Sequence, residues 1–147
     1  MKVAQILKCK DGECLITVSP NDTVLKALNL MSEHNIGAVV VIEKGNLAGI
    51  FSERDYARKG ILTGRTAVET LISEVMTEKV LTVSPQFKIE DCIEIMSEKH
   101  IRHLPVVENN RAMGMVSASD ILTAVLGEHK NRIASLEHYI TGQPTYA

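Results

Sequence analysis

The sequence predicts a mixed α/β (α+β) fold made of two copies of one β-α-β-β-α unit, followed by a C-terminal helix. Thr17-Val-Ser-Pro20 recurs as Thr82-Val-Ser-Pro85, and the following residues stay in register at an offset of 65 residues through Asp55 and Asp120. Within each copy the apolar spacing changes from helical to strand-like, and short polar turns separate the strands. A chain that repeats itself in this way is interpreted first as two related units.

Each copy is predicted to contain a helix after its Ser-Pro. The apolar residues there lie at i, i+3, i+4 and i+7, namely Val24, Ala27, Leu28 and Met31 in the first copy and Ile89, Cys92, Ile93 and Met96 in the second. This spacing places one apolar stripe on a helix face. Cys92 is therefore interpreted as a small buried hydrophobic residue.

A hairpin and a second helix follow in each copy. Short β-branched runs predict the hairpin strands, at 38–42 and 47–51 in the first copy and at 103–107 and 112–116 in the second. The second helix is expected to begin at Ser52-Glu-Arg-Asp55 and at Ser117-Ala-Ser-Asp120, where serine followed three residues later by an acid resembles a capping box.

The remaining segments set the predicted boundaries. Short apolar helices at 3–7 and 72–76 precede the copies, and residues 60–68 join them, which gives repeats at 3–62 and 68–127. Because 65 residues bury little surface alone, we expect the copies to share one core. Residues 128–147 are predicted to form an appended amphipathic helix and a tail, with Ile133, Leu136 and Ile140 on one face. That face packs on its own chain or on a second subunit.

Composition excludes several classes of partner. A net charge of −2 supplies no basic field for nucleic acid, and no apolar run approaches the roughly 18 residues of a membrane span. The first eight residues lack the features of a secretory signal, so we expect a cytoplasmic protein with reduced thiols. Cys9 and Cys14 lack further ligands at zinc-type spacing, so no metal site is predicted.

The repeated Gly-x-x-Ser-x-x-Asp element is the candidate site. It places a hydroxyl and a carboxylate where a strand ends and a helix begins, a junction suited to anions. Ser117 and Ser119 can donate to phosphate oxygens, and Asp120 can accept from two ribose hydroxyls. The alternative is that serine and aspartate only cap the helix.

The two copies differ in charge around this element. Arg102 and His103 directly precede Leu104-Pro-Val-Val107 of the second copy and would lie opposite Ser117, where they can bind phosphate. The first copy has uncharged Gly37 and Ala38 at the matching positions. It offers Arg54, Arg58 and Lys59 instead, as a second phosphate site or as a solvated helix face.

The sequence offers no catalytic machinery. It contains no nucleophile elbow, P-loop, metal-ligand cluster or G-x-G-x-x-G motif. We therefore expect neither an enzyme nor catalytic residues nor a catalytic cofactor. The open alternative to ligand binding is a protein-protein interaction module without a small-molecule ligand.

The repeated motifs resemble a known family. His100-Ile-Arg-His-Leu-Pro-Val-Val107, Gly114-Met-Val-Ser-Ala-Ser-Asp120 and Gly49-Ile-Phe-Ser-Glu-Arg-Asp55 look like the signatures of a tandem pair of CBS domains, a Bateman module, over about residues 3–127. The chain is similar to small stand-alone bacterial proteins of this kind. The resemblance implies two CBS-type repeats related by a pseudo-twofold axis, an adenosine derivative bound between them, and assembly into a homodimer.

Carried across, the family pattern implies two related sites. It places ribose on Asp120, phosphate on the serines, arginine and histidine of the second copy, and adenine among apolar residues; the set is Asp120, Ser117, Ser119, Arg102, His103, Met115, Ile36, Gly37 and Ile16. The second possible site comprises Asp55, Ser52, Arg54, Arg58, Lys59, Leu81 and Ile101.

The implied function is regulatory sensing of cellular energy state. The ligand would be AMP, ADP, ATP or NAD(H), with S-adenosylmethionine less favoured. Binding would shift the relative orientation of the copies or subunits, and any regulated target would be a separate protein.

Overall fold

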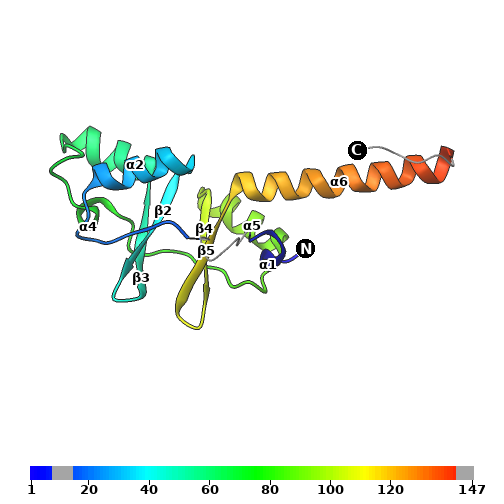
Figure 1. Ribbon diagram of the computed structural model, residues 1–147, viewed down its shortest axis with the longest axis horizontal. Helices are drawn as coiled ribbons and strands as arrows, with labels where there is room; N and C mark the ends of the chain where they lie inside the picture. The colour runs from blue at the N-terminus through cyan, green and yellow to red at the C-terminus, as the bar shows by residue number, and fades with distance from the viewer. Residues whose placement is uncertain (8–14, 142–147) are drawn as a thin grey trace.

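The structure is a computed structural model and describes residues 1–7 and 15–141 (Figure 1). The first copy comprises β1 (Thr17–Val18), α2 (Val24–His34), β2 (Ala38–Glu43), β3 (Asn46–Ser52) and α3 (Glu53–Asp55), then a π-helical turn at Tyr56–Gly60 and a 3-10 turn at Ile61–Thr63. The second comprises α5 (Ile89–Lys99), β4 (His103–Glu108), β5 (Arg111–Ser117) and α6 (Ala118–Thr141). The short helices α1 (Val3–Ile6) and α4 (Ile72–Val75) precede the two copies.

Both predicted hairpins are confirmed, and they lie side by side with their tips pointing the same way (Figure 1). The antiparallel pairs run from Ala38 opposite Ser52 and from His103 opposite Ser117. The tip residues have positive φ, at Lys44 and Gly45 in one turn and at Asn109 and Asn110 in the other. Glycine and asparagine tolerate this conformation better than most residues, which explains where the chain turns.

The predicted first strand of the second copy is reduced to a single bridge. Val83 pairs in parallel with Val106, whereas in the first copy β1 pairs with β2 over two residues. The Val40 N–H donates to the Ile16 carbonyl at 3.4 Å there. Pro105 holds the position that corresponds to Val40 and has no N–H to donate, so the parallel ladder is interrupted.

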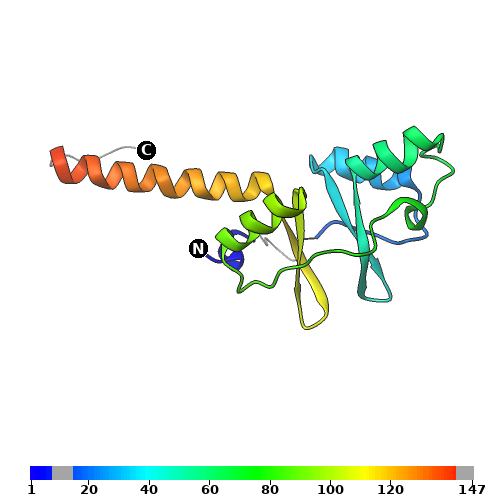
Figure 2. The ribbon, with the colours of Figure 1, turned by 180° about the vertical axis from the view of Figure 1, so that it is seen from behind.

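The expectation of one shared core is wrong, because each copy packs its own apolar cluster. The cluster of the first copy contains Phe51 and that of the second contains Leu104. Each is completed by the short helix that precedes the other copy. Val3 of α1 is buried in the second cluster, and Ile72 and Val75 of α4 are buried in the first. Figures 1 and 2 show this exchange, with α1 beside α5 and α4 beside the first copy.

The exchanged segments explain the glycine of the repeated motif. A Cβ atom on Gly49 would lie 2.6 Å from the Thr77 carbonyl oxygen, because Thr77 and Ile50 exchange backbone hydrogen bonds of 2.9 and 3.0 Å. A Cβ atom on Gly114 would lie 2.9 Å from Leu7 Cδ2. Both glycines therefore admit the chain segment that follows the exchanged helix.

The appended helix predicted to start at residue 128 is not a separate element. Instead α6 runs without a break from Ala118 to Thr141, so the second helix of the second copy and the appended helix are one element. A single glycine inside a helix costs only about 1 kcal/mol and does not end it. The far part of α6 extends well beyond the body (Figure 2).

Cys92 is buried as expected, and burial raises the pKa of its thiol, with Asp91 adding to the effect. Cys9 and Cys14 lie outside the described residues.

Over residues 1–7 and 15–141, no helix combines the length and the apolar character that crossing a membrane requires.

Candidate functional site: a cleft between the two copies

The serine and aspartate of the repeated motif cap the helix that follows each hairpin. The Asp55 N–H donates to Ser52 Oγ at 3.2 Å, and the Ser52 N–H donates to Asp55 Oδ2 at 3.0 Å. The second copy repeats this arrangement between Ser117 and Asp120, at 3.1 and 2.9 Å. The capping interpretation therefore holds in both copies, and it uses one carboxylate oxygen of each aspartate.

The two carboxylates differ in what else they contact. Asp55 is only 9% exposed, and it also accepts hydrogen bonds from Ser52 Oγ and Thr77 Oγ1, both at 3.1 Å. Lys59 Nζ lies 3.4 Å from its Oδ1. Asp120 is exposed, and within the described part of the chain the Ser117 N–H donates a hydrogen bond to its carboxylate. Asp120 thus keeps acceptor capacity that Asp55 has already used.

A cleft of about 650 Å³ lies between the copies and reaches both motifs. This volume is within the range of small-molecule sites. β3 and β5 face each other across the boundary, and the cleft is lined from both copies by Asn35, Ile36, Gly37, Ile50, Ser52, Glu53, Arg54, Asp55, Thr77, Ile101, Arg102, His103, Met115, Ser117, Ala118, Ser119 and Asp120. The two predicted sites therefore open into one cavity.

His103 lies where the copies meet. A Cβ atom on Gly37 would be 3.5 Å from His103 Cε1 and 4.0 Å from a carboxylate oxygen of Glu53. Burial lowers the pKa of His103, Asp120 and Glu53 act in the opposite direction, and Arg102 and Arg54 lower it further. The ring is therefore neutral near pH 7 and stands among two cations and two anions.

Arg54 bridges the copies. Its Nη1 donates to the His100 carbonyl oxygen at 2.9 Å, where α5 ends in a left-handed residue. A cation at the carboxyl end of a helix is favoured by the helix dipole. In the second copy, Ser119 holds the position that corresponds to Arg54.

The cleft brings together most of the predicted residues but not all of them. Ile16 packs against the core of the first copy, Leu81 is exposed, and neither of them, nor Arg58 or Lys59, lines the cleft. Lys59 instead contacts Asp55, Thr77 and the Met76 carbonyl oxygen.

Five lining residues were missed: Asn35, Ile50, Glu53, Thr77 and Ala118. Glu53 carried a signal, because it is a charge inside the repeated motif where the other copy has Ala118. Thr77 carried no such signal in the sequence, because it reaches Asp55 only when α4 packs against the first copy.

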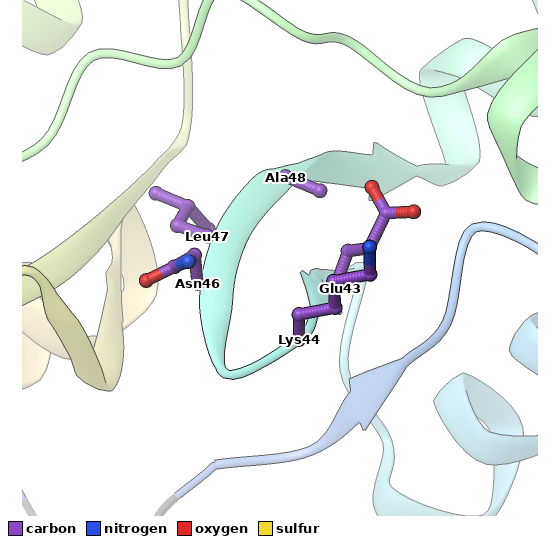
Figure 3. Close-up of a pocket in the computed structure, with 5 residues that line it drawn as sticks. All are labelled: Glu43, Lys44, Asn46, Leu47 and Ala48. Carbon is purple, nitrogen blue, oxygen red and sulfur yellow. The ribbon is translucent and has the colours of Figure 1, made fainter.

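A second pocket, of about 310 Å³, lies at the tip of the first hairpin and is lined by Glu43, Lys44, Asn46, Leu47 and Ala48 (Figure 3). It holds neither copy of the motif. Within the described part of the chain, no group of three or more His, Cys, Asp or Glu side chains is arranged to hold a metal ion.

The comparison with protein families decides what this arrangement represents. The model of the CBS domain matches the chain twice, at residues 13–61 and 72–127. The chain belongs to the CBS domain family. It is a CBS-pair regulatory module, and the resemblance inferred from the motifs and the two-repeat fold with its C-terminal helix are confirmed.

Known CBS proteins match over most of the chain. The mitochondrial CBS domain-containing protein CBSX3 of Arabidopsis thaliana is 39% identical over 149 residues, covering 95% of this chain and 72% of that protein. A solved protein with CBS domains from Burkholderia ambifaria is 41% identical, with a TM-score of 0.81, covering 86% of this chain and 95% of that one.

The CBS domain pair of protein MJ0100 was solved in complex with 5′-methylthioadenosine and S-adenosyl-L-methionine. It is 27% identical to this chain, with a TM-score of 0.75, covering 87% of this chain and 98% of that one.

Proposed function

We propose that this CBS pair binds one phosphate-bearing adenosine ligand in the cleft between its copies, with Asp120 as the anchor for the ribose. The observation that carries the proposal is the contrast between the two aspartates. Asp120 is exposed beside a cleft of about 650 Å³, whereas Asp55 is buried and hydrogen-bonded. An anionic oxygen with free acceptor capacity suits a vicinal diol.

The side chains around Asp120 bind the phosphate of the ligand in this proposal. Arg102 and His103 line the same cleft as Ser117 and Ser119, and Arg54 lines it from the other copy. Arginine is the strong phosphate donor, and hydroxyl groups add neutral donors. Met115, Ile36 and Gly37 line the cleft as well and supply the less polar surface that an adenine ring needs.

This charge distribution ranks the ligands. Two arginines beside the proposed ribose site favour AMP, ADP, ATP or NAD(H) over S-adenosylmethionine, which carries a positive sulfonium and no phosphate. The neighbour solved with S-adenosylmethionine and methylthioadenosine supports adenosine recognition in this kind of module. We rank S-adenosylmethionine behind the phosphate-bearing ligands.

Thermal unfolding with each of AMP, ADP, ATP, NAD, NADH and S-adenosylmethionine tests the proposal. A ligand at about 100 times its Kd that binds only the folded state stabilises it by about 2.7 kcal/mol. We expect a rise in Tm of roughly 5–10 °C for at least one phosphate-bearing ligand. No response to any of the six would favour the interaction module that binds no small molecule.

Asp120→Asn is the informative variant, because asparagine keeps one acceptor oxygen for the Ser117 N–H while losing the charge. We expect its Tm without ligand to stay close to that of the wild type and its ligand-induced shift to be mostly lost. Asp91→Asn is the matched control, because Asp91 is an exposed acid in the first turn of α5 and does not line the cleft. An equal loss in both variants would contradict the assignment.

The regulatory output belongs to the same proposal. We propose a cytoplasmic homodimer that binds and does not hydrolyse its nucleotide, and that acts on a separate protein through ligand-dependent reorientation of its copies. Only a ligand that binds the two orientations with different affinity can shift their equilibrium.

A further inference from the structure

The outer face of α6 carries a heptad pattern. Counting from Leu122, apolar residues or a histidine recur at spacings of four, three, four, three and four, at Leu122, Leu126, His129, Ile133, Leu136 and Ile140. Alternation of three and four is the spacing at which two helices pack along a shared seam. On a helix of 3.6 residues per turn, the five positions from Leu122 to Leu136 lie on one narrow stripe.

This seam is separate from the face that packs on the body of the molecule. Ile121 is buried in the second core, and Ala124 and Val125 pack against that core. The leucines and the isoleucine between them on the seam stay exposed, at 59% for Leu122, 52% for Leu126, 55% for Ile133 and 56% for Leu136. An apolar stripe of this length, on a helix that extends beyond the body (Figure 1), is typical of an interaction surface.

We propose that α6 pairs with α6 of a second copy of this chain as a short, parallel, two-stranded coiled coil. The proposal deepens the homodimer part of the proposed function and does not depend on the ligand. A second copy of the chain presents the same apolar stripe with the same length and repeat, so it is a matching partner. At 1.5 Å per residue, the stretch 122–140 is about 27 Å long.

The side chains in the repeat favour this geometry. In heptad notation the a positions are Leu126, Ile133 and Ile140 and the d positions are Leu122, His129 and Leu136. In parallel coiled coils, β-branched residues at a with leucine at d favour two strands, a pattern that Ile133 and Leu136 follow, whereas a polar residue in the seam, here His129, lowers the stability of the pair. Arg132 at g and Glu137 at e lie five residues apart, the spacing at which opposite charges meet between parallel strands.

Sedimentation equilibrium of the full chain tests the pairing. We expect a dimer that the double variant Ile133→Glu with Leu136→Glu converts to a monomer, because it places charges inside the seam. Asn131→Glu is the matched control on the opposite side of α6 and should leave the dimer intact. His129→Leu should lower the dimer dissociation constant by about tenfold or more, because an apolar side chain then fills the seam. A monomeric wild type, or a dimer that the double variant leaves unchanged, would overturn the proposal.

Charge reversal tests the parallel orientation. Arg132→Glu should weaken the dimer, and adding Glu137→Arg should restore it, since the two positions then attract again with exchanged signs. An antiparallel seam brings g against g and e against e, so the double reversal would give no rescue and the orientation would be refuted. The ligand-induced Tm shift is measured separately on the same variants. Loss of the ligand-induced Tm shift would count against the proposed site in the cleft, whereas loss of the dimer would report on α6.

Discussion

Asp55 and Asp120 occupy equivalent places in the two copies, but their carboxylates have different surroundings. Thr77 and Lys59 contact Asp55 in addition to its capping serine. In a pair of duplicated sites, one aspartate has become part of the internal hydrogen-bond network of its copy, while the other remains available at the cleft. The same motif thus serves packing in one copy, whereas its carboxylate stays exposed in the other.

Alanine substitution of the two aspartates should separate these roles. Asp120→Ala removes a helix cap and should lower the free energy of unfolding by about 1 kcal/mol. Asp55→Ala also leaves the hydroxyls of Ser52 and Thr77 without their acceptor, so its loss should exceed that of Asp120→Ala by about 1–2 kcal/mol. Urea unfolding of both variants without ligand measures the difference. Equal losses would mean that the contacts of Thr77 and Lys59 contribute little.

His103 should make ligand affinity depend on pH. Burial lowers its pKa, so the ring is neutral near pH 7 in the free protein. A bound phosphate would favour the protonated ring and raise that pKa, so binding takes up a proton. Affinity for AMP should therefore increase as the pH falls from 7.5 toward 5.5, by at most about tenfold per pH unit for one proton.

His103→Asn is the control for this pH dependence, because the phosphate of AMP itself titrates near pH 6. The AMP affinity of wild type and variant is measured by calorimetric titration at each pH. Titration of the AMP phosphate affects both proteins equally, so the difference between their affinities reports the contribution of the His103 ring. Parallel pH profiles would show that His103 does not sense the phosphate.

In each copy, the second strand of the hairpin lies close to the segment that follows the exchanged helix. The close approach is at Gly49 in the first copy and at Gly114 in the second. The two glycines differ in what a methyl group would meet. It would meet the backbone carbonyl of Thr77 at Gly49 and the end of the flexible Leu7 side chain at Gly114.

Gly49→Ala should therefore be the more destabilising of two otherwise matched substitutions. Moving a backbone segment that is hydrogen-bonded to Ile50 is costly, in the range of about 1–3 kcal/mol for overpacking, whereas Leu7 can rotate away. Thermal unfolding of Gly49→Ala and Gly114→Ala compares the two sites. The reverse order would contradict the tight contact at Thr77.

The elements that sequence patterns predicted correctly are those governed by local spacing. The hairpins follow from β-branched runs and turn residues, and α2 and α5 follow from helical periodicity. The boundary predicted between residues 127 and 128 is absent, because α6 continues through Gly127 and a single glycine does not end a helix.

Contacts between the copies were not predictable in the same way. A four-residue apolar helix such as α1 or α4 carries no signal for which sheet it covers. The polar residues of the motif could be found because the motif repeats in the sequence. The contact of Thr77 with Asp55 and the hydrogen bond from Arg54 to the His100 carbonyl could not, because they depend on the tertiary arrangement.

The whole molecule is held together by its exchanged helices. Ile72 of α4 is fully buried in the first copy, and Val3 of α1 is fully buried in the second. A defect in either helix should therefore loosen the copy that it covers rather than the copy that it precedes in the sequence.

Hydrogen exchange measured by mass spectrometry tests this crossed dependence. Ile72→Ala, at a cost of about 2–5 kcal/mol, should reduce amide protection mainly in α2, β2 and β3. Val3→Ala should reduce it mainly in α5, β4 and β5. Loss of protection confined to the copy that follows each helix in sequence would contradict the exchange.

The crossed arrangement also sets an order of events during translation. As the chain leaves the ribosome, the first copy lacks its covering helix until residues 72–75 have emerged, so the first 65 residues cannot complete their core alone. Helix α1, although made before either copy, finds its binding surface only after β5 has been made. The last strand synthesised thus closes the first helix into place, and a fragment that ends at the joint between the copies would expose apolar surface in both of its unfinished parts.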